Sequence, residues 1–233
     1  MIIPVLFEDA HLLAVDKPPG RIVIPGRGTE EPSLREELEA SHGRLWVIHR
    51  LDRGTSGVLV FARTAEAHRA MNLAFDRGEP AKTYLALVRG EPPDGWRETA
   101  AIAPARRGRM RPARRGEPQG KAAATAFRAL ERFPARPWAG GALALVEARP
   151  ETGRTHQIRV HLAHGGFPLA VDPDYGDDSP LRSPAGAVLL DRTPLHAARL
   201  EVRHPAGGRS LAVEAPLPAD LSAALAALRA GGA

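Results

Sequence analysis

Apolar and polar residues form short blocks along this chain, and the spacing within each block predicts a strand or a helix. Two apolar runs, Leu12–Lys17 and Val58–Ala62, are typical of strands. After Thr64 the apolar residues recur every three or four positions, which predicts a helix with one apolar face. That face consists of Ala67, Met71, Ala74 and Phe75, and Gly78 ends the helix.

The remaining blocks extend this pattern over the rest of the chain. Ser33 and Glu36 have the spacing of a capping box, so a short helix begins there. A further helix is expected from Thr152 to Ala163, and a last one begins at Asp220. The other predicted strands are Arg21–Ile24, Thr83–Val88, Ala124–Arg132, Ala142–Ala148, Leu195–Val202 and Leu211–Val213.

The order of these elements indicates the fold class. Strands follow one another with a few helices between them, and no regular alternation of strand, helix and strand occurs. Such an order is typical of an α+β fold with a mixed, largely antiparallel β-sheet and flanking helices. No segment has the composition of a linker, so we expect residues 1–233 to form a single domain.

Composition excludes several classes of protein. The 233 residues are enough for a real core, and an apolar content of 43% is ordinary for a globular protein. The absence of cysteine excludes disulfides and thiolate metal sites. No apolar stretch approaches the roughly 20 residues of a membrane helix. The N-terminus also lacks the features of a signal peptide, so we expect a soluble, cytoplasmic protein.

The positive charge is carried almost entirely by arginine. Three of the 32 basic residues are lysines, and the formal net charge is +5. A GC-rich genome would account for most of this ratio. It does not explain why arginines cluster in Pro104–Lys121, which we expect to be a loop and which has only one acid, Glu117. Arginine binds phosphates and stacks on bases, although a charge run is more often a solvated surface. The clustered residues are Arg106, Arg107, Arg109, Arg111, Arg114 and Arg115.

Three short segments carry candidate chemistry. In His49–Gly57, Asp52 lies between two arginines and just before a predicted strand, where a carboxylate is well placed to react. Lys82–Tyr84 begins another strand with an aromatic hydroxyl. Glu151–Ala163 combines several polar side chains at the start of a predicted helix, where an anion or a nucleobase can bind. On that helix Arg159 would share a face with Thr155.

Each of these residues also has a purely structural interpretation. Asp52 can be a turn acid, Tyr84 a strand aromatic with its hydroxyl at the surface, and Arg159 a solvated charge. A metal site built from the histidines of the last segment is disfavoured, because their spacing does not match known zinc motifs, even if Asp172 and Asp174 added ligands. These histidines are His156, His161 and His164.

Taken together and in this order, the segments resemble the signatures of RluA-type pseudouridine synthases. His49–Gly57 matches HRLD-x-x-TSG, Lys82–Tyr84 matches K-x-Y, and Thr152–Leu162 matches TGRTHQ-hydrophobic-R-x-H. Val15–Gly20 is similar to the KP-x-G turn of the family. One departure is Val171. In the segment that resembles Pro168–Gly176, relatives usually have glycine before the aspartate.

The resemblance implies the pseudouridine synthase catalytic fold and an isomerase that converts specific uridines in RNA to pseudouridine without a cofactor or a metal. It implies three catalytic residues. Asp52 would act on the sugar as a nucleophile or as a proton abstractor, and both routes stay open. Arg159 would provide a fixed opposite charge that keeps this carboxylate ionised despite burial. Tyr84 would stack on the base.

The resemblance also implies RNA as the partner, either a ribosomal or a transfer RNA stem-loop, and we expect a monomer with no obligate protein partner. Many relatives carry a small RNA-binding domain in front of the catalytic one. This sequence begins directly with the catalytic part, so we expect binding to come from that part itself. The predicted RNA-binding residues are Arg50, Arg53, Arg106, Arg107, Arg109, Arg111, Arg114, Arg115, Arg154 and His156.

Two other classes of function remain open at this point. A catalytically inactive RNA-binding protein of the same fold would explain the charge, but it would not explain an intact set of Asp52, Tyr84 and Arg159. A glycosidase that uses an aspartate nucleophile would need a second carboxylate, and none occurs in a comparable motif.

Overall fold

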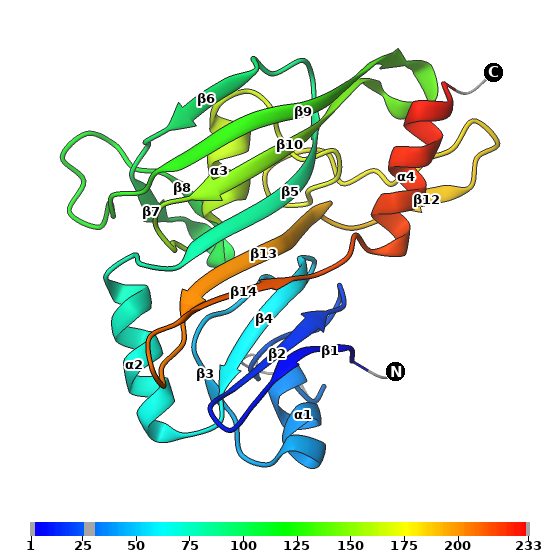
Figure 1. Cartoon of the computed structure of the whole chain (residues 1–233). Coiled ribbons are helices and arrows are strands. Elements are labelled where there is room, and N and C mark those ends of the chain that lie inside the picture. Colours follow the sequence, from blue (N-terminus) through cyan, green and yellow to red (C-terminus); the bar gives the residue numbers. More distant parts are fainter. Residues whose placement is uncertain (1–2, 26–30, 232–233) are drawn as a thin grey trace. The chain divides into compact units, whose positions relative to one another are not determined.

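The computed structural model describes residues 3–25 and 31–231, and it divides into two compact units (Figure 1). Unit 1 comprises Met1–Lys82 and His196–Pro216, and unit 2 comprises Thr83–Leu195 and Leu217–Ala233. The strands are mostly antiparallel, which confirms the predicted α+β class. In the described residues the α-helices are α1 (Leu34–His42), α2 (Ala65–Asp76), α3 (Gln157–His164) and α4 (Ala219–Ala230).

Unit 1 is built on the strand order β1-β2-β4-β13, with β14 paired to β13 and β3 paired to β4. All of these pairs are antiparallel except β4 with β13, where His196 lies opposite Ser56 in a parallel register. The strands are β1 (Val5–Glu8), β2 (Leu12–Lys17), β3 (Trp46–Val47), β4 (Ser56–Ala62), β13 (Leu195–Arg203) and β14 (Ser210–Glu214).

The core of unit 1 follows the alternation of its strands. Leu12 and Ala14 of β2 join Val58 and Val60 of β4 in one cluster, which also contains Met71 of α2. The residues between them are buried as well, so both faces of these strands are covered.

Both predicted helix starts in unit 1 are present as hydrogen bonds. The backbone N–H of Ser33 donates to Glu36 at 2.8 Å, and Glu36 N–H donates back to Ser33 Oγ. Thr64 Oγ1 accepts from the backbone N–H of Ala67 at 3.1 Å.

Unit 2 is built on the antiparallel order β5-β10-β9-β6. Alternate residues of β5 and β10 point to opposite faces. Leu87 and Leu143 pack with α4, while Ala86 and Ala144 pack with α3 (Figure 1). The strands of unit 2 are β5 (Ala81–Arg89, its first two residues in unit 1), β6 (Gly95–Glu98), β7 (Ile102–Pro104), β8 (Met110–Pro112), β9 (Thr125–Arg136), β10 (Gly141–Pro150), β11 (Leu181–Arg182) and β12 (Val188–Leu190).

Three predicted elements differ in the structure. Arg21–Ile24 is not a strand, because the carbonyl groups of Ile22 and Val23 accept hydrogen bonds from the first N–H groups of α1. The helix expected from Thr152 begins at Gln157. Pro104–Lys121 is not only a loop, since it supplies β8, which pairs with β7 in a hairpin. Among the described helices, none is long and apolar enough to cross a membrane.

Candidate active site

Asp52 lies in a tight turn between β3 and β4 of unit 1. Its carbonyl oxygen accepts a hydrogen bond from the N–H of Thr55 at 3.1 Å, and its side chain is half-buried. The next carbonyl, that of Arg53, accepts from Gly20 N–H at 2.8 Å and from the ammonium of Lys17 at 3.2 Å. Lys17 is fully buried. The Lys-Pro-Pro-Gly turn therefore holds the backbone that presents the Asp52 carboxylate.

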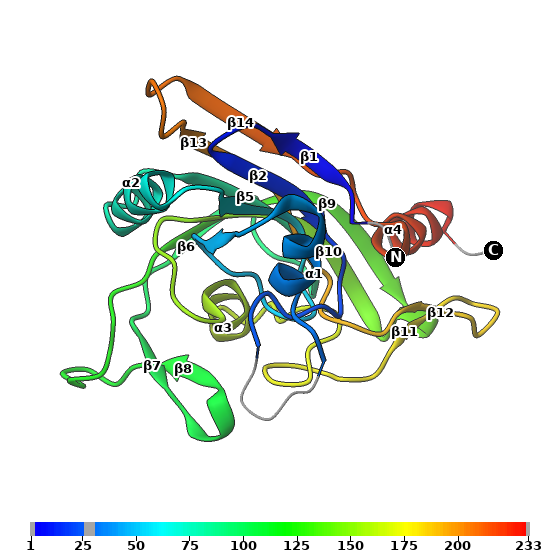
Figure 2. The same cartoon turned by 90° about the horizontal axis from the view of Figure 1, so that it is seen from below.

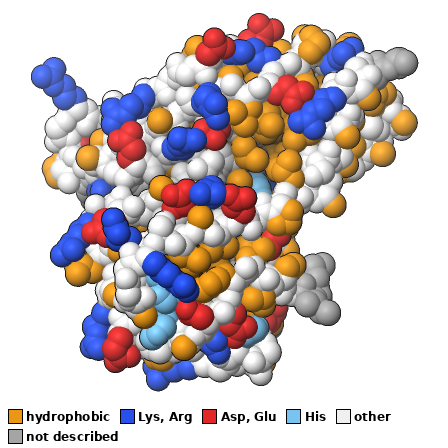
Figure 3. Space-filling model, viewed as in Figure 1, with side chains coloured by type: hydrophobic (Ala, Val, Ile, Leu, Met, Phe, Trp, Pro, Cys, Tyr) orange, Lys and Arg blue, Asp and Glu red, His pale blue; other side chains and the backbone are white. Residues whose placement is uncertain are grey.

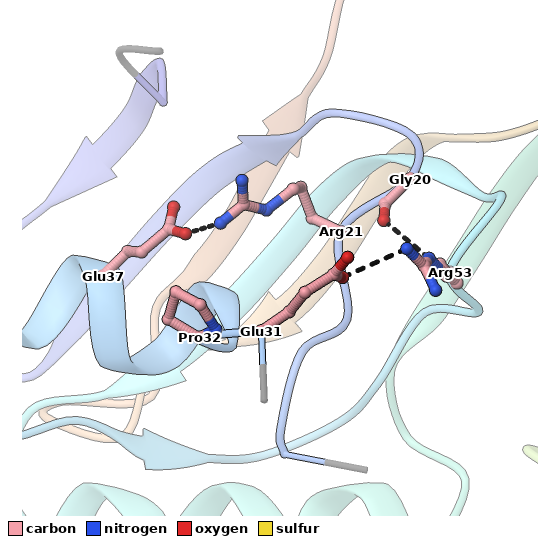
Figure 4. A pocket seen from close by; sticks show the side chains of 6 residues that line it. All are labelled: Gly20, Arg21, Glu31, Pro32, Glu37 and Arg53. Atoms are coloured by element: carbon pink, nitrogen blue, oxygen red, sulfur yellow. Dashed lines mark hydrogen bonds and ion pairs between the residues drawn. The ribbon is translucent and has the colours of Figure 1, made fainter. Parts of the chain in front are cut away.

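Arg53 borders a small polar cavity in unit 1, of about 340 Å³ (Figure 4). Its guanidinium pairs with Glu31 at 3.1 Å and donates to the carbonyl of Gly20 at 2.9 Å. Across the cavity Arg21 pairs with Glu37. Two predicted RNA-binding residues thus differ. Both are exposed, but Arg53 pairs with Glu31, whereas Arg50 forms no ion pair with a described residue.

The side chain of His49, at the start of the segment His49–Gly57, provides a hydrogen-bond acceptor for β4 where no paired strand does. Because β3 has only two residues, the N–H of Val60 in β4 is left beyond its end, and it donates to His49 Nε2 at 3.1 Å. The imidazole also stacks on Phe75 of α2, with ring centroids 5.1 Å apart. Burial, reinforced by the positive charge of Lys82, lowers the pKa of His49 to about 4. The ring is therefore neutral, as its acceptor role requires.

This histidine makes the protein sensitive to mild acid. Its pKa is about 6.5 in an unfolded chain, so between pH 6.5 and pH 4 the unfolded state binds the proton and the folded state does not. Stability is complete above pH 6.5 and is lost as the pH falls through this window. We expect the free energy of unfolding to fall by about 2 kcal/mol from pH 7 to pH 5 through this group.

Urea denaturation at the two pH values measures this effect. His49→Gln keeps a hydrogen-bond acceptor but does not titrate in this range, so its stability should change less with pH than that of the wild type. An equal pH dependence in both proteins would contradict the assignment.

Tyr84 and Arg159 belong to unit 2. Tyr84 lies on β5 opposite Ala148 of β10, and its half-buried ring packs on the cluster that includes Ile158 of α3. Arg159 itself lies on α3. Its side chain is only 6% exposed, so its charge must be matched by acids close to it.

Two aspartates of the loop after α3 match the charge of Arg159. Its Nε and Nη2 donate to the two oxygens of Asp172 at 2.9 and 2.6 Å, and Nη2 also donates to Asp174 at 2.7 Å. The ring of Tyr175 covers the guanidinium, whose carbon lies 4.9 Å from the ring centroid. The guanidinium is thus held in one plane and one orientation.

The sequence motifs indicate Arg159 but not these partners. From the sequence, Asp172 and Asp174 are candidates only as metal ligands, and Tyr175 is not a candidate at all. The predicted helix could have indicated that Arg159 has acidic partners. Val160 and Leu162 are apolar neighbours of Arg159, and an arginine in a buried helix needs nearby acids. Val171, the departure from the family pattern, is fully buried in the core of unit 2 and has no positive φ, so valine fits there.

The start of α3 depends on a series of buried and partly buried hydrogen bonds. Thr152 donates to the side-chain oxygen of Gln157 at 2.6 Å, and the amide of Gln157 donates to Thr125 Oγ1 at 3.0 Å. Because His161 Nε2 donates to the Ala100 carbonyl, its Nδ1 accepts from Thr125. These hydrogen bonds hold Thr152 outside the helix and occupy both ring nitrogens of His161.

The histidines of this segment have separate environments. Within residues 3–25 and 31–231, no three His, Asp or Glu side chains gather as a metal site requires. His156, one of the predicted RNA-binding residues, precedes α3 with a φ of 54°, and its Nδ1 lies 2.8 Å from the hydroxyl of Tyr175. Arg154 is exposed, and its Nε donates to the carbonyl of Ala122.

The arginine cluster forms a hairpin, Ile102–Lys121, that projects from unit 2 (Figure 2). We call it the arginine hairpin. Arg111 pairs with Glu117 at 2.6 Å, which lowers the pKa of that carboxyl to about 2. Arg109 pairs with Asp174 at 3.0 Å. The remaining four are exposed and form no ion pair with any described residue: Arg106, Arg107, Arg114 and Arg115.

Comparisons with known proteins agree on one family. A family model described as RNA pseudouridylate synthase matches residues 11–164. Ribosomal large subunit pseudouridine synthase D of Nitrosomonas europaea is 42% identical over 235 residues, which cover 97% of this chain and 65% of that protein. Synthase C of Vibrio parahaemolyticus is 35% identical over 230 residues, covering 97% and 69%. This chain thus spans about two thirds of the length of these relatives.

A solved structure extends the likeness to the fold. Human RNA pseudouridylate synthase domain containing 4 matches with a TM-score of 0.74 at 26% sequence identity. The match covers 97% of this chain and 93% of that one.

Proposed function

Because this chain belongs to the RNA pseudouridylate synthase family, we propose that it isomerises uridine to pseudouridine within RNA. The family expected from the three motifs is confirmed. The observation that carries the proposal furthest is the turn at Asp52, which lies inside the matched region and presents a half-buried carboxylate on a fixed backbone.

Asp52, Tyr84 and Arg159 divide the chemistry among them in this proposal. The bond between the ribose carbon and the base nitrogen breaks, the base turns over, and a carbon–carbon bond forms while a proton moves from carbon to nitrogen. Asp52 acts on the ribose as an ionised carboxylate, either as nucleophile or as proton abstractor. Arg159 supplies the opposite charge, and its fixed orientation in unit 2 supports that role because a preorganised charge needs no rearrangement during the reaction. Tyr84 stacks on the base.

The uridine has to leave its stack before this chemistry, which costs a few kcal/mol. Phosphate contacts offset that cost and make binding dependent on salt. Four exposed arginines of the arginine hairpin suit this role, because none of them forms an ion pair with an acid of the described chain. On the face seen in Figure 3, by contrast, basic and acidic side chains are interspersed. The same role is proposed for Arg50, Arg53, Arg154 and His156, with Arg111 supporting the hairpin.

The substrate proposed first is ribosomal RNA of the large subunit, because relatives that cover nearly this whole chain are named for it. A transfer RNA stem-loop is the second substrate to test. We also propose that the protein acts in the cytoplasm as a monomer, without a cofactor or an obligate protein partner.

Arg50 precedes Asp52 by two residues and is exposed, so it is placed to fill the space that the flipped base leaves. Arg50→Ala should lower turnover on folded RNA at least about tenfold, while the melting temperature changes little because no described residue pairs with this side chain. Single-turnover assays and thermal melts measure the two effects. Equal losses of activity and stability would contradict the role.

The proposed function is tested by incubating the protein with uridine-containing transcripts of large-subunit and transfer RNA. Pseudouridine is then mapped by carbodiimide treatment and reverse-transcription stops. New stops at defined positions support an isomerase. Binding without stops would indicate an inactive RNA-binding protein, and release of free base would indicate a hydrolase.

A further inference from the structure

One carboxylate in unit 2 joins the arginine hairpin to Arg159. Asp174 Oδ2 accepts from Arg159 Nη2 at 2.7 Å, and its Oδ1 accepts from Arg109 Nε at 3.0 Å. The side chain is 29% exposed. Burial raises the pKa of Asp174. The hydrogen bond and charge of Arg159, together with the charge of Arg109, lower that pKa by more than burial raises it, so the net shift is downward. Asp174 is therefore an ionised bridge between two guanidinium groups.

Two further contacts tie the arginine hairpin to the same loop. Arg109 Nη2 donates to the carbonyl of Pro173 at 3.2 Å, and the N–H of Met110 donates to the hydroxyl of Tyr175 at 2.8 Å. Because the Tyr175 ring covers the guanidinium of Arg159, two consecutive hairpin residues reach two neighbours of that group, Asp174 and Tyr175.

Arg109 differs in this respect from the other hairpin arginines. Arg106 and Arg107, at the tip, are exposed and pair with no described residue. Arg111 pairs within the hairpin. Arg109 alone of the six forms an ion pair with a described residue outside the hairpin, and that residue also binds Arg159.

We propose that Arg109 and Asp174 are positioning residues that hold the guanidinium of Arg159, so that the arginine hairpin sets the rate of the reaction as well as the affinity for RNA. Asp172 binds one edge of the guanidinium, and Asp174 adds a second acceptor on Nη2 that resists its rotation. Without Arg109, the Asp174 carboxylate keeps only one of its two guanidinium partners and is held less firmly. This inference rests on the proposed function of Arg159.

Single-turnover kinetics on the transcript that the wild type modifies tests the pair. We expect Arg109→Gln and Asp174→Asn each to lower the rate at saturating RNA about tenfold, while the Kd for RNA changes less than about threefold. Because the two residues act through one contact, the double variant should be no slower than the worse single variant. Arg109→Lys should recover part of the rate, since an ammonium still pairs with Asp174.

Two variants serve as matched controls. Asp177→Asn removes another acid of the same loop, which pairs with Arg89 at 3.0 Å and does not touch Arg159, and the rate should not change. Arg107→Gln removes a hairpin charge without an internal partner, and its main effect should be on the Kd. Loss of affinity with an unchanged saturated rate in Arg109→Gln, or additive effects in the double variant, would overturn the proposal.

A second measurement does not depend on activity. In the folded protein the Nε–H NMR signal of Arg159 should be sharp and protected from solvent exchange, and it should broaden or exchange faster in Arg109→Gln and in Asp174→Asn but not in Asp177→Asn. An unchanged signal in all variants would reject the pair. A wild type that modifies no transcript would instead count against the proposed function, and the NMR result would still decide whether Arg109 and Asp174 hold Arg159.

Discussion

Asp52→Asn is expected to abolish pseudouridine formation, with turnover at least about 10⁴-fold lower than in the wild type, as for other residues that react directly. The substitution keeps the size of the side chain and removes its charge, so it can neither attack the sugar nor accept a proton. The turn itself should persist, because it depends on the backbone of Asp52 and Arg53 and on Lys17. Carbodiimide mapping over long incubations measures the residual rate.

The control for this variant is Asp76→Asn, which neutralises an exposed acid at the end of α2 and should retain full activity. RNA affinity and melting temperature should be nearly equal in the wild type and in Asp52→Asn. Retention of more than about 1% of the wild-type rate by Asp52→Asn would remove Asp52 from the reaction.

Gly57→Ala should have the largest effect on stability. Gly57 has a φ of 109°, which side-chain-bearing residues rarely adopt, and β4 runs so close to β13 there that a Cβ atom would lie 2.2 Å from the carbonyl oxygen of Ala197. The neighbour is backbone in a paired strand and cannot turn aside. We expect the free energy of unfolding to fall by at least about 4 kcal/mol, or the protein not to fold.

Gly20→Ala separates the two causes of this loss. Gly20 also has a positive φ, 84°, but a Cβ atom at this position would have no described neighbour within 4 Å, so only the backbone strain remains. That strain should cost about 1–2 kcal/mol in urea denaturation. Similar losses in the two variants would show that the approach to Ala197 is not what requires glycine at position 57.

The elements that the sequence predicts well are those whose signal is local. Leu12–Lys17 is found with the expected bounds, and the helices after Ser33 and Thr64 begin where a side chain caps them. The sequence pattern does not predict the short strands β3, β6 and β7. They have two to four residues each and owe their conformation to the strands they pair with, which leaves no periodic pattern in the sequence.

The candidate site shows the same division. The motifs indicate Asp52, Tyr84 and Arg159 from residue types and order alone. The acids that hold Arg159 lie in an irregular loop, and only the folding of that loop onto α3 brings Asp172 and Asp174 to the guanidinium. The helix start expected at Thr152 is too early, because the hydroxyl that would have capped the helix donates to Gln157 instead.

The part of the arginine hairpin after Pro112 has a consequence for which substitutions the proposed function tolerates. Among the described residues, Glu117 forms hydrogen bonds only within the segment 111–120, so the hairpin beyond Pro112 is braced from within. Arg109 and Met110, in the turn and strand that precede this part, carry the contacts to the loop of Asp174 and Tyr175. Under the proposed function, substitutions after Pro112 are therefore expected to change the affinity for RNA or the choice of target while the rate of the reaction is retained.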